Sequence, residues 1–197
     1  MKVELLSITP NAEFLVASAY GICTGKDTIP LENIQKWIKR GHLSPIEHAL
    51  ATFLIEGISR SCLAQITRHR LSSFSVQSMR YCDVSKNDII MPDSIKDDEY
   101  ARVLFLAKVK SLRETYKILT KIGIPKQDAR YVLPIGTTTK LIMSSNFRQW
   151  RTVIEQRCNK AAQWEIRQVC TRILELLYKE SPNVFKDLEE RFLNEQN

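Results

Sequence analysis

Glycine is scarce in this chain of 197 residues, and its six glycines are too far apart to form a nucleotide-binding loop. Neither GxGxxG nor GxxxxGK followed by Ser or Thr occurs, so a Rossmann fingerprint and a P-loop are both excluded. The five cysteines contain no CxxC pair, and the three histidines contain no HExxH pattern. We therefore expect neither a disulfide framework nor a bound metal, and any nucleotide must be held by side chains and helix ends.

Long apolar runs are also absent. No run approaches the ~20 residues that span a membrane, and the N-terminal segment meets Glu4, Pro10 and Glu13 too early for a secretory signal. Repeats and linkers rich in serine or glycine are missing, so nothing divides the chain. With 44% hydrophobic residues, the chain can bury a full core. We expect a single domain over residues 1–197, cytoplasmic, with reduced thiols and no membrane partner.

The spacing of apolar residues predicts strands and helices in an irregular order. Strands are predicted over residues 2–8, 48–59 and 137–145. Helices are predicted over residues 31–41, 59–68, 93–123, 124–134 and 147–158, followed by a last long helix whose buried side covers residues 166–177. Ser144, Ser145 or Asn146 can cap the helix that begins at Phe147. Because strands and helices do not alternate regularly, an α+β fold is favoured over a doubly wound sheet.

Positive charge is concentrated in two stretches. Twenty-nine basic residues against 22 acidic ones give a net charge of +7, which favours an anionic partner such as nucleic acid, a membrane surface or a phosphorylated small molecule. The stretch RHRLSSFSVQSMRY, residues 68–81, contains Arg68, Arg70 and Arg80 and no acid, and residues 140–172 carry seven basic residues against two glutamates. Arginine binds phosphate or carboxylate through a planar fork, so this excess indicates defined contacts with oxyanions.

Alternative roles for the residues of these stretches have less support. Nucleic acid is not expected as a partner, because helix-turn-helix, zinc-finger and aromatic-rich RNP patterns are all absent. Arg148 and Arg151 could form ordinary surface pairs with Glu155, worth only ~0.3–0.5 kcal/mol. Ser78 would need a base to act as a nucleophile and none is evident, so we interpret it as a binding or polarising hydroxyl. His69 is expected to be neutral, because the arginines on either side disfavour its protonated form.

Several ordered motifs resemble those of flavin-dependent thymidylate synthases. Arg68, His69 and Arg70, followed after seven residues by Ser78, match the family signature. The segments GHLSPIEH, GIPKQDARYVLP, SSNFRQWRTVIEQRC and AAQWEIR are also similar to family segments, so the resemblance covers residues 41–178.

This resemblance implies a fold, an assembly and a reaction. A single α+β domain is expected, with a central, mainly antiparallel sheet flanked by long helices and assembled as a homotetramer. The implied reaction is the methylation of deoxyuridylate to thymidylate, a methyltransferase-class activity, with methylenetetrahydrofolate as carbon donor, FAD as hydride carrier and NADPH as reductant. No covalent enzyme nucleophile is implied. These ligands bring several anionic groups, which suits charge-assisted arginine contacts worth roughly 1.5–3 kcal/mol each.

The resemblance also implies roles for individual residues. The residues expected to act in catalysis are Arg157, on the uracil carbonyl, and Ser78. The residues expected to bind deoxyuridylate are Gln65, Arg68, Gln77, Ser78, Arg80, Arg130 and Arg157. The residues expected to bind FAD are Ser44, Glu47, Arg68, His69, Arg70, Asn146, Arg148 and Thr152. His42 and Tyr81 match positions on the folate side, where their rings offer flat surfaces for the pterin.

The chain departs from the family pattern at three positions. Val76 stands where relatives usually carry an acidic or amide side chain, Thr152 where many have asparagine, and Ala161 where many have a histidine on the flavin. These departures bear on flavin affinity. Val76 and Ala161 also motivate an alternative hypothesis, a degenerate relative that binds nucleotide or RNA without turnover.

Overall fold

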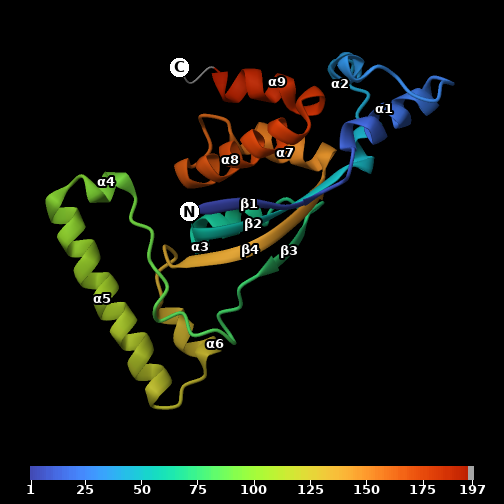
Figure 1. Ribbon diagram of the computed structural model, residues 1–197. Helices are drawn as coiled ribbons and strands as arrows, with labels where there is room; N and C mark the ends of the chain where they lie inside the picture. Colours follow the sequence, from blue (N-terminus) through green and yellow to red (C-terminus); the bar gives the residue numbers. More distant parts are fainter. Residues whose placement is uncertain (195–197) are drawn as a thin grey trace. The chain divides into compact units, whose positions relative to one another are not determined.

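The computed structural model describes residues 1–194 and contains a four-stranded antiparallel sheet (Figure 1). Its strands are β1 (Lys2–Ile8), β2 (Leu50–Ser59), β3 (Ser73–Val76) and β4 (Thr138–Asn146), in the order β1-β2-β4-β3 across the sheet. Buried residues alternate with more exposed ones along most of β2 and along β4, as in a sheet that packs one face against a core. The predicted α+β class is confirmed.

The chain divides into two compact units, and each is described by itself. Unit 1 contains residues 1–55, 66–75 and those from 142 onward, and unit 2 contains residues 56–65 and 76–141. The arginine-rich motif belongs to both units, because residues 68–75 lie in unit 1 and residues 76–81 in unit 2. No helix within residues 1–194 is long and apolar enough to cross a membrane.

Unit 1 holds most of the helices. They are α1 (Ala12–Cys23), η1 (Leu31–Asn33), α2 (Ile34–Lys39), η2 (Ser44–His48), α7 (Phe147–Arg157), α8 (Trp164–Glu180) and α9 (Pro182–Phe192), with α8 and α9 packed on one another (Figure 1). Trp150 of α7 is fully buried and lies edge to face with Phe53 of β2, at a centroid distance of 5.0 Å. Its Nε1 also donates to the carbonyl of Ala51 at 3.0 Å. Trp150 therefore anchors α7 on β2.

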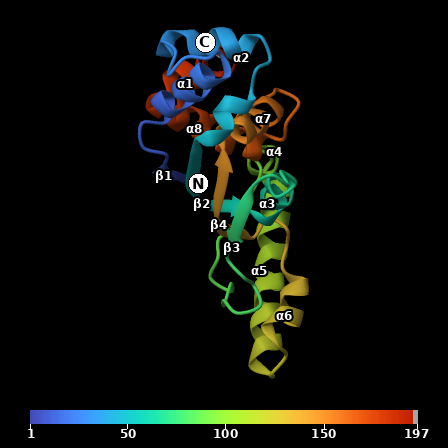
Figure 2. The ribbon, with the colours of Figure 1, turned by 90° about the vertical axis from the view of Figure 1, so that its right-hand side faces the viewer.

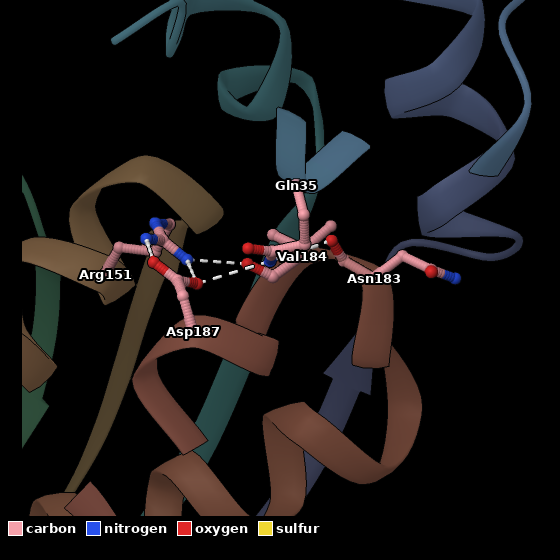
Figure 3. A network of polar contacts seen from close by, with 5 residues as sticks. All are labelled: Gln35, Arg151, Asn183, Val184 and Asp187. Carbon is pink, nitrogen blue, oxygen red and sulfur yellow. Dashed lines mark hydrogen bonds and ion pairs between the residues drawn. The ribbon is translucent and has the colours of Figure 1, made fainter. Parts of the chain in front are cut away.

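An ion pair between buried Arg151 and partly buried Asp187 joins α7 to α9 (Figure 3). Arg151 donates to Asp187 through Nη2 at 2.5 Å and through Nη1 at 2.8 Å, and Nη1 also reaches the carbonyl of Val184 at 2.6 Å. Gln35 of α2 donates to the same carboxylate at 3.2 Å and to the carbonyl of Asn183 at 3.0 Å. Burial alone would raise the pKa of Asp187, but the hydrogen bonds and charge of Arg151 hold it below its usual value. One charged network thus ties α2, α7 and α9 together.

Unit 2 is dominated by one long helix. Its helices are α3 (Arg60–Ile66), α4 (Asp93–Lys96), α5 (Glu99–Lys121, Figure 2), α6 (Lys126–Ala129) and η3 (Arg130–Val132), with the last residue of α3 assigned to unit 1. Within α5 only Tyr116 is buried, in a cluster with Met79, Val84 and Ala129. The exposed large apolar residues of α5 are Tyr100, Val103, Leu104, Leu106 and Ile118. The described chain therefore leaves an apolar surface on α5 uncovered.

Most predicted elements are confirmed, but the helix predicted over residues 93–123 is not continuous. Asp98 adopts an extended conformation, and its carboxylate accepts a hydrogen bond from the backbone of Ala101 at 2.7 Å. This cap ends α4 and begins a new helix. Of the three possible caps for α7, Asn146 is the one used, since its Oδ1 accepts from Gln149 N at 2.8 Å.

Four elements were not predicted: η2, β3, α1 and α9. The strand β3 lies inside the arginine-rich motif, and its only signal is the alternation of polar and apolar residues over the four residues SFSV. The sequence of α1 is apolar nearly all round, so it offers no polar face to mark a helix, and Asn11 before it makes no side-chain cap. The helix α9 follows α8, so the predicted last long helix is not the last. On α8 itself, Leu174 is fully buried and Leu176 only partly.

Candidate active site

The arginine-rich motif turns a histidine inward between exposed arginines. Arg68 and Arg70 are exposed, whereas His69 keeps only 5% of its surface exposed. The backbone of His69 donates to the carbonyl of Ile66, at the end of α3, at 3.3 Å, and its own carbonyl accepts from Ser72 N at 3.1 Å. A tight turn after α3 therefore fixes the direction of the imidazole.

The buried imidazole meets an arginine from the far end of α7. Arg157 donates through Nε to His69 Nε2 at 3.0 Å, although the two residues are 88 apart in the sequence. Burial, and after it the charge of Arg157, lowers the pKa of His69 from 6.5 to about 4. The predicted neutral state of His69 is therefore confirmed, but the expected cause, the two flanking arginines, is replaced by burial and Arg157.

The other residues predicted on the flavin side lie at the start of α7 and on η2. Arg148 forms an ion pair with Glu47, with 2.5 Å between Nη1 and Oε1. Thr152 donates its hydroxyl to the carbonyl of Arg148 at 3.2 Å, so it serves the helix backbone. The Oδ1 of Asn146 caps α7, and this leaves its amide NH₂ unused by the cap. The alternative pairing of Arg148 and Arg151 with Glu155 is wrong, because these arginines bind Glu47 and Asp187.

The predicted folate-side residue His42 belongs to an aromatic cluster in unit 1. Its ring lies 5.6 Å from that of Tyr20 and 5.8 Å from that of Trp37, both edge to face, and Tyr20 and Trp37 are stacked at 6.0 Å. The hydroxyl of Tyr20 donates to the carbonyl of His42 at 2.6 Å, and burial raises the pKa of Tyr20 to about 12. Ser44, two residues on, is exposed at the start of η2.

Unit 2 gathers two of the four arginines that were predicted to bind the nucleotide around one glutamine. Arg80 donates through Nε to the side-chain Oε1 of Gln127 at 3.2 Å, and Arg130 donates through Nε to the backbone carbonyl of the same residue at 2.9 Å. Both acceptors are neutral, so the two guanidinium groups keep their charge. Each of the two hydrogen bonds uses only the Nε atom of its arginine. The two Nη atoms, which can bind an oxyanion with two parallel hydrogen bonds, are not used by these bonds.

Two aromatic and basic neighbours extend this cluster. The guanidinium of Arg80 lies 5.6 Å from the ring centre of Tyr81, the second predicted folate-side residue, which is 75% exposed. Lys126 donates to the carbonyl of Tyr81 at 3.0 Å. The pKa of Arg60 is lowered, first by burial and then by the charge of Arg130. The described part of unit 2 thus places several cations around one short helix, α6.

The remaining predicted residues of unit 2 organise the backbone near this cluster. Ser78 accepts a hydrogen bond at its Oγ from the backbone of Arg80 at 3.2 Å. Gln77 donates its backbone N–H to Lys140 at 2.9 Å, and Gln65 lies half-buried at the end of α3. No hydrogen bond among the described residues joins Ser78 to a carboxylate or an imidazole. The hydroxyl is therefore placed as a positioning group, without a base to activate it.

The comparison with protein families decides to which one this chain belongs. A family model described as thymidylate synthase complementing protein matches residues 4–183. The chain belongs to the flavin-dependent thymidylate synthase family. Three relatives carry the name flavin-dependent thymidylate synthase. That of Haloarcula marismortui is 38% identical, covering 81% of this chain and 75% of the relative. Those of Geobacter sulfurreducens and Clostridium tetani are 34% and 36% identical, covering 95% and 94% of this chain and 86% of each relative.

Membership of the flavin-dependent thymidylate synthase family confirms the resemblance drawn from the motifs, and the match extends it into the first forty residues. Nothing in these comparisons favours the alternative hypothesis of a degenerate relative. The roles assigned to individual residues stay predictions. Their distribution is clear: every residue predicted to bind FAD lies in unit 1, whereas Gln65, Gln77, Ser78, Arg80 and Arg130 lie in unit 2.

Sequence reasoning missed two residues that the structure places at the site. Gln127 holds both Arg80 and Arg130, and Arg60 lies close enough to Arg130 to be affected by its charge. Gln127 was visible as part of the segment GIPKQDARYVLP, but nothing in the sequence indicates that its side-chain amide will accept from Arg80 and its backbone carbonyl from Arg130. A separate cavity of about 450 Å³ is lined by residues 8–14, Leu31 and Glu180, and it contains no predicted site residue.

Proposed function

We propose that this protein is a flavin-dependent thymidylate synthase that methylates deoxyuridylate to thymidylate, with methylenetetrahydrofolate as carbon donor and NADPH as reductant. The observation that carries the proposal is the family match over residues 4–183, which contains the complete motif from Arg68 to Ser78. FAD, when bound, supplies the hydride that the substrate receives. The geometry of the arginines is suited to the binding of ligands that carry several negative charges.

The deoxyuridylate phosphate is proposed to bind at Arg80 and Arg130. Each of these arginines is anchored through Nε to a neutral acceptor on Gln127, so charge and the Nη edge both remain for a phosphate. Ser78 lies beside them and holds the turn through the Arg80 amide. Gln65 and Gln77 supply amide groups, which can hydrogen-bond to a uracil ring.

The FAD contacts are proposed to lie in unit 1. Exposed Arg68 and Arg70 can meet an anionic pyrophosphate, and the NH₂ group of Asn146 remains a hydrogen-bond donor at the start of α7. The Arg148 and Glu47 pair presents both a cation and a carboxylate, and Thr152 lies one turn further along α7. These groups fit a cofactor with both anionic and hydrogen-bonding parts. Ser44 completes the proposed set from η2.

The structure supports a reaction without a covalent enzyme nucleophile. Ser78 has a backbone amide as its described partner, and the thiol of Cys158 is held un-ionised because burial raises its pKa to about 11. Arg157 is proposed to contact the uracil carbonyl, where its fixed positive charge would stabilise negative charge that develops on the ring. His42 and Tyr81 are proposed to contact the folate.

The assembly is proposed to be a homotetramer of one domain per chain, residues 1–197. The uncovered apolar residues of α5 support self-association, because a long helix with a single buried residue needs a further partner surface. Sedimentation of the purified protein tests this: a species of four chains is expected, and a monomer at all concentrations would contradict it. None of the five cysteines forms a disulfide within residues 1–194, which agrees with the proposed cytoplasmic location.

The experiment that tests the function is direct. The purified protein, supplied with FAD, is expected to show a flavin absorbance spectrum and to form thymidylate from deoxyuridylate, methylenetetrahydrofolate and NADPH. Omission of each component in turn is the control. A protein that binds FAD and deoxyuridylate but forms no thymidylate under these conditions would overturn the proposal.

A further inference from the structure

The hydrogen bond between Arg157 and His69 restrains an arginine in an unusual way. The Nε–H of a guanidinium lies in the same plane as its two Nη groups, so an acceptor at Nε defines the orientation of that plane. Here the acceptor is the Nε2 lone pair of a buried imidazole at 3.0 Å. An imidazole that accepts at Nε2 carries its proton on Nδ1.

We propose that His69 is a positioning residue for Arg157, and that its Nε2 atom sets the plane in which Arg157 presents its guanidinium to the nucleotide. This inference rests on the proposed function, in which Arg157 contacts the uracil. It assigns His69 a task in addition to its predicted contact with FAD. His69 would thereby act on the substrate through another residue.

The acceptor is itself held from both sides. The backbone bonds of His69 to Ile66 and Ser72 fix the turn that carries the imidazole. The hydroxyl of Ser72 accepts from the Ser145 hydroxyl at 2.5 Å, and Ser145 is in β4, directly before α7. The turn and the helix that carries Arg157 therefore share a connection independent of the His69 bond. These bonds hold the backbone of the turn, and the burial of His69, which is 5% exposed, limits movement of its imidazole away from Arg157.

The neutral imidazole suits this task better than a carboxylate would. The carboxylates of Glu47 and Asp187 bind Arg148 and Arg151 through their Nη atoms and neutralise them. Neutral His69 brings no negative charge to Arg157, so this hydrogen bond does not itself neutralise the guanidinium. Its low pKa keeps the lone pair available across the physiological range.

The first test concerns the hydrogen bond and needs no turnover. The chain has only three histidines, so single replacements assign the imidazole ¹⁵N signals of the ligand-free protein. We expect His69 to carry its proton on Nδ1 and to remain neutral from pH 5 to 8. In Arg157→Leu the proton should shift towards Nε2 and the pKa should rise towards 6.5. A wild-type His69 protonated on Nε2, or an unchanged tautomer in Arg157→Leu, would overturn the proposal.

The second test asks whether the acceptor at Nε2 is what His69 supplies to the reaction. His69→Gln keeps an acceptor near the place of Nε2, whereas His69→Leu removes it. We expect His69→Leu to lower kcat for thymidylate formation by about 10- to 100-fold, since small misplacements of a catalytic group have effects of this size, and His69→Gln to recover much of it. The KM for deoxyuridylate should change less. His48→Gln, at an exposed histidine outside the assigned site, is the control for the replacement.

Coupling between the two residues completes the test. If His69 acts through Arg157, the losses in kcat caused by His69→Leu and Arg157→Lys should overlap, and the double variant should be little worse than either alone. Losses that multiply would mean that the two residues act independently, and would overturn the proposal. Arg172→Lys, at an exposed residue paired with Glu175, is the matched control. A wild-type protein that forms no thymidylate would refute the proposed function instead. The tautomer measurement would still decide whether His69 Nε2 accepts a hydrogen bond from Arg157.

Discussion

The two units of the chain treat their arginines differently. In unit 1, Arg148 and Arg151 bind carboxylates through their Nη atoms, with distances down to 2.5 Å. In unit 2, Arg80 and Arg130 bind neutral oxygens of Gln127 through Nε. A carboxylate neutralises an arginine and uses the fork that a phosphate would need, whereas a neutral acceptor at Nε orients the group and leaves its charge. The acceptor therefore separates structural arginines from those suited to binding anions.

Arg157 belongs to unit 1 but is anchored as the arginines of unit 2 are. Its Nε donates to a neutral imidazole. This is the one arginine of α7 predicted to contact the nucleotide, and its anchoring agrees with that role. Variants that alter one kind of anchor at a time should have effects of decreasing size. The largest is a loss of stability at the Arg151–Asp187 pair of unit 1, and the smallest is a loss of deoxyuridylate affinity at Gln127 in unit 2.

Breaking the carboxylate pair of unit 1 should cost the most stability. Arg151→Met leaves the mostly buried Asp187 without its partner, and an uncompensated buried charge costs about 3–5 kcal/mol. Urea unfolding at neutral pH, where Asp187 is ionised, should show this loss relative to the wild type. Arg172→Met, which removes an exposed pair, should change the free energy of unfolding by less than about 1 kcal/mol. Equal losses in the two variants would mean that the network in Figure 3 is not a stabilising one.

The neutral acceptor His69 should make stability depend on pH. Its folded pKa of about 4 lies below the unfolded value of 6.5, so between these values the unfolded chain binds more protons. The free energy of unfolding should therefore rise with pH across this window, by up to about 1.4 kcal/mol per pH unit from this group, and be lost as the pH falls. His69→Gln should remove that part of the slope in urea titrations at pH 5, 6 and 7. The same slope in both proteins would refute the assignment.

Removing a charge that unit 2 leaves uncompensated should affect one ligand selectively. Arg80→Ala is expected to weaken deoxyuridylate binding by about 10- to 100-fold, the size of one charge-assisted hydrogen bond of about 1.5–3 kcal/mol. FAD binding should change far less, because the residues predicted to hold FAD lie in unit 1. Calorimetry with each ligand measures both effects. Equal losses for the two ligands would mean that the role of Arg80 is wrongly assigned.

Converting the neutral anchor of unit 2 into the carboxylate type of unit 1 is the finest test. Gln127→Ala removes one acceptor from Arg80 and should weaken deoxyuridylate binding only several-fold, by about 1 kcal/mol. Gln127→Glu keeps the acceptor but adds a negative charge, so it should weaken binding more than Gln127→Ala does. The salt dependence of the affinity gives a second measure. If Gln127→Glu binds as tightly as the wild type, the neutrality of the anchor is unimportant.

Much of the fold could be predicted from local sequence patterns. The cap at Asn146, the buried side of α7 and the strands β1, β2 and β4 follow from short-range spacing, which depends on neighbours within a turn or a pleat. The break at Asp98 was a capping signal within an otherwise helical pattern. The helix α9 also had a signal, because Pro182 begins it and Val184, Phe185 and Leu188 recur at helical spacing.

The family, the reaction class and the residue types at the site all follow from the sequence, because the motifs are ordered runs of chemically distinctive side chains. Which of these groups meet depends on the tertiary structure, which pairs His69 with Arg157, Arg151 with Asp187, and Gln127 with Arg80. These partners lie between 36 and 88 residues apart, so the path of the backbone brings them together. An arginine in a sequence can bind a carboxylate, an amide or a ligand equally well, and the acceptor placed beside it by the fold decides among them.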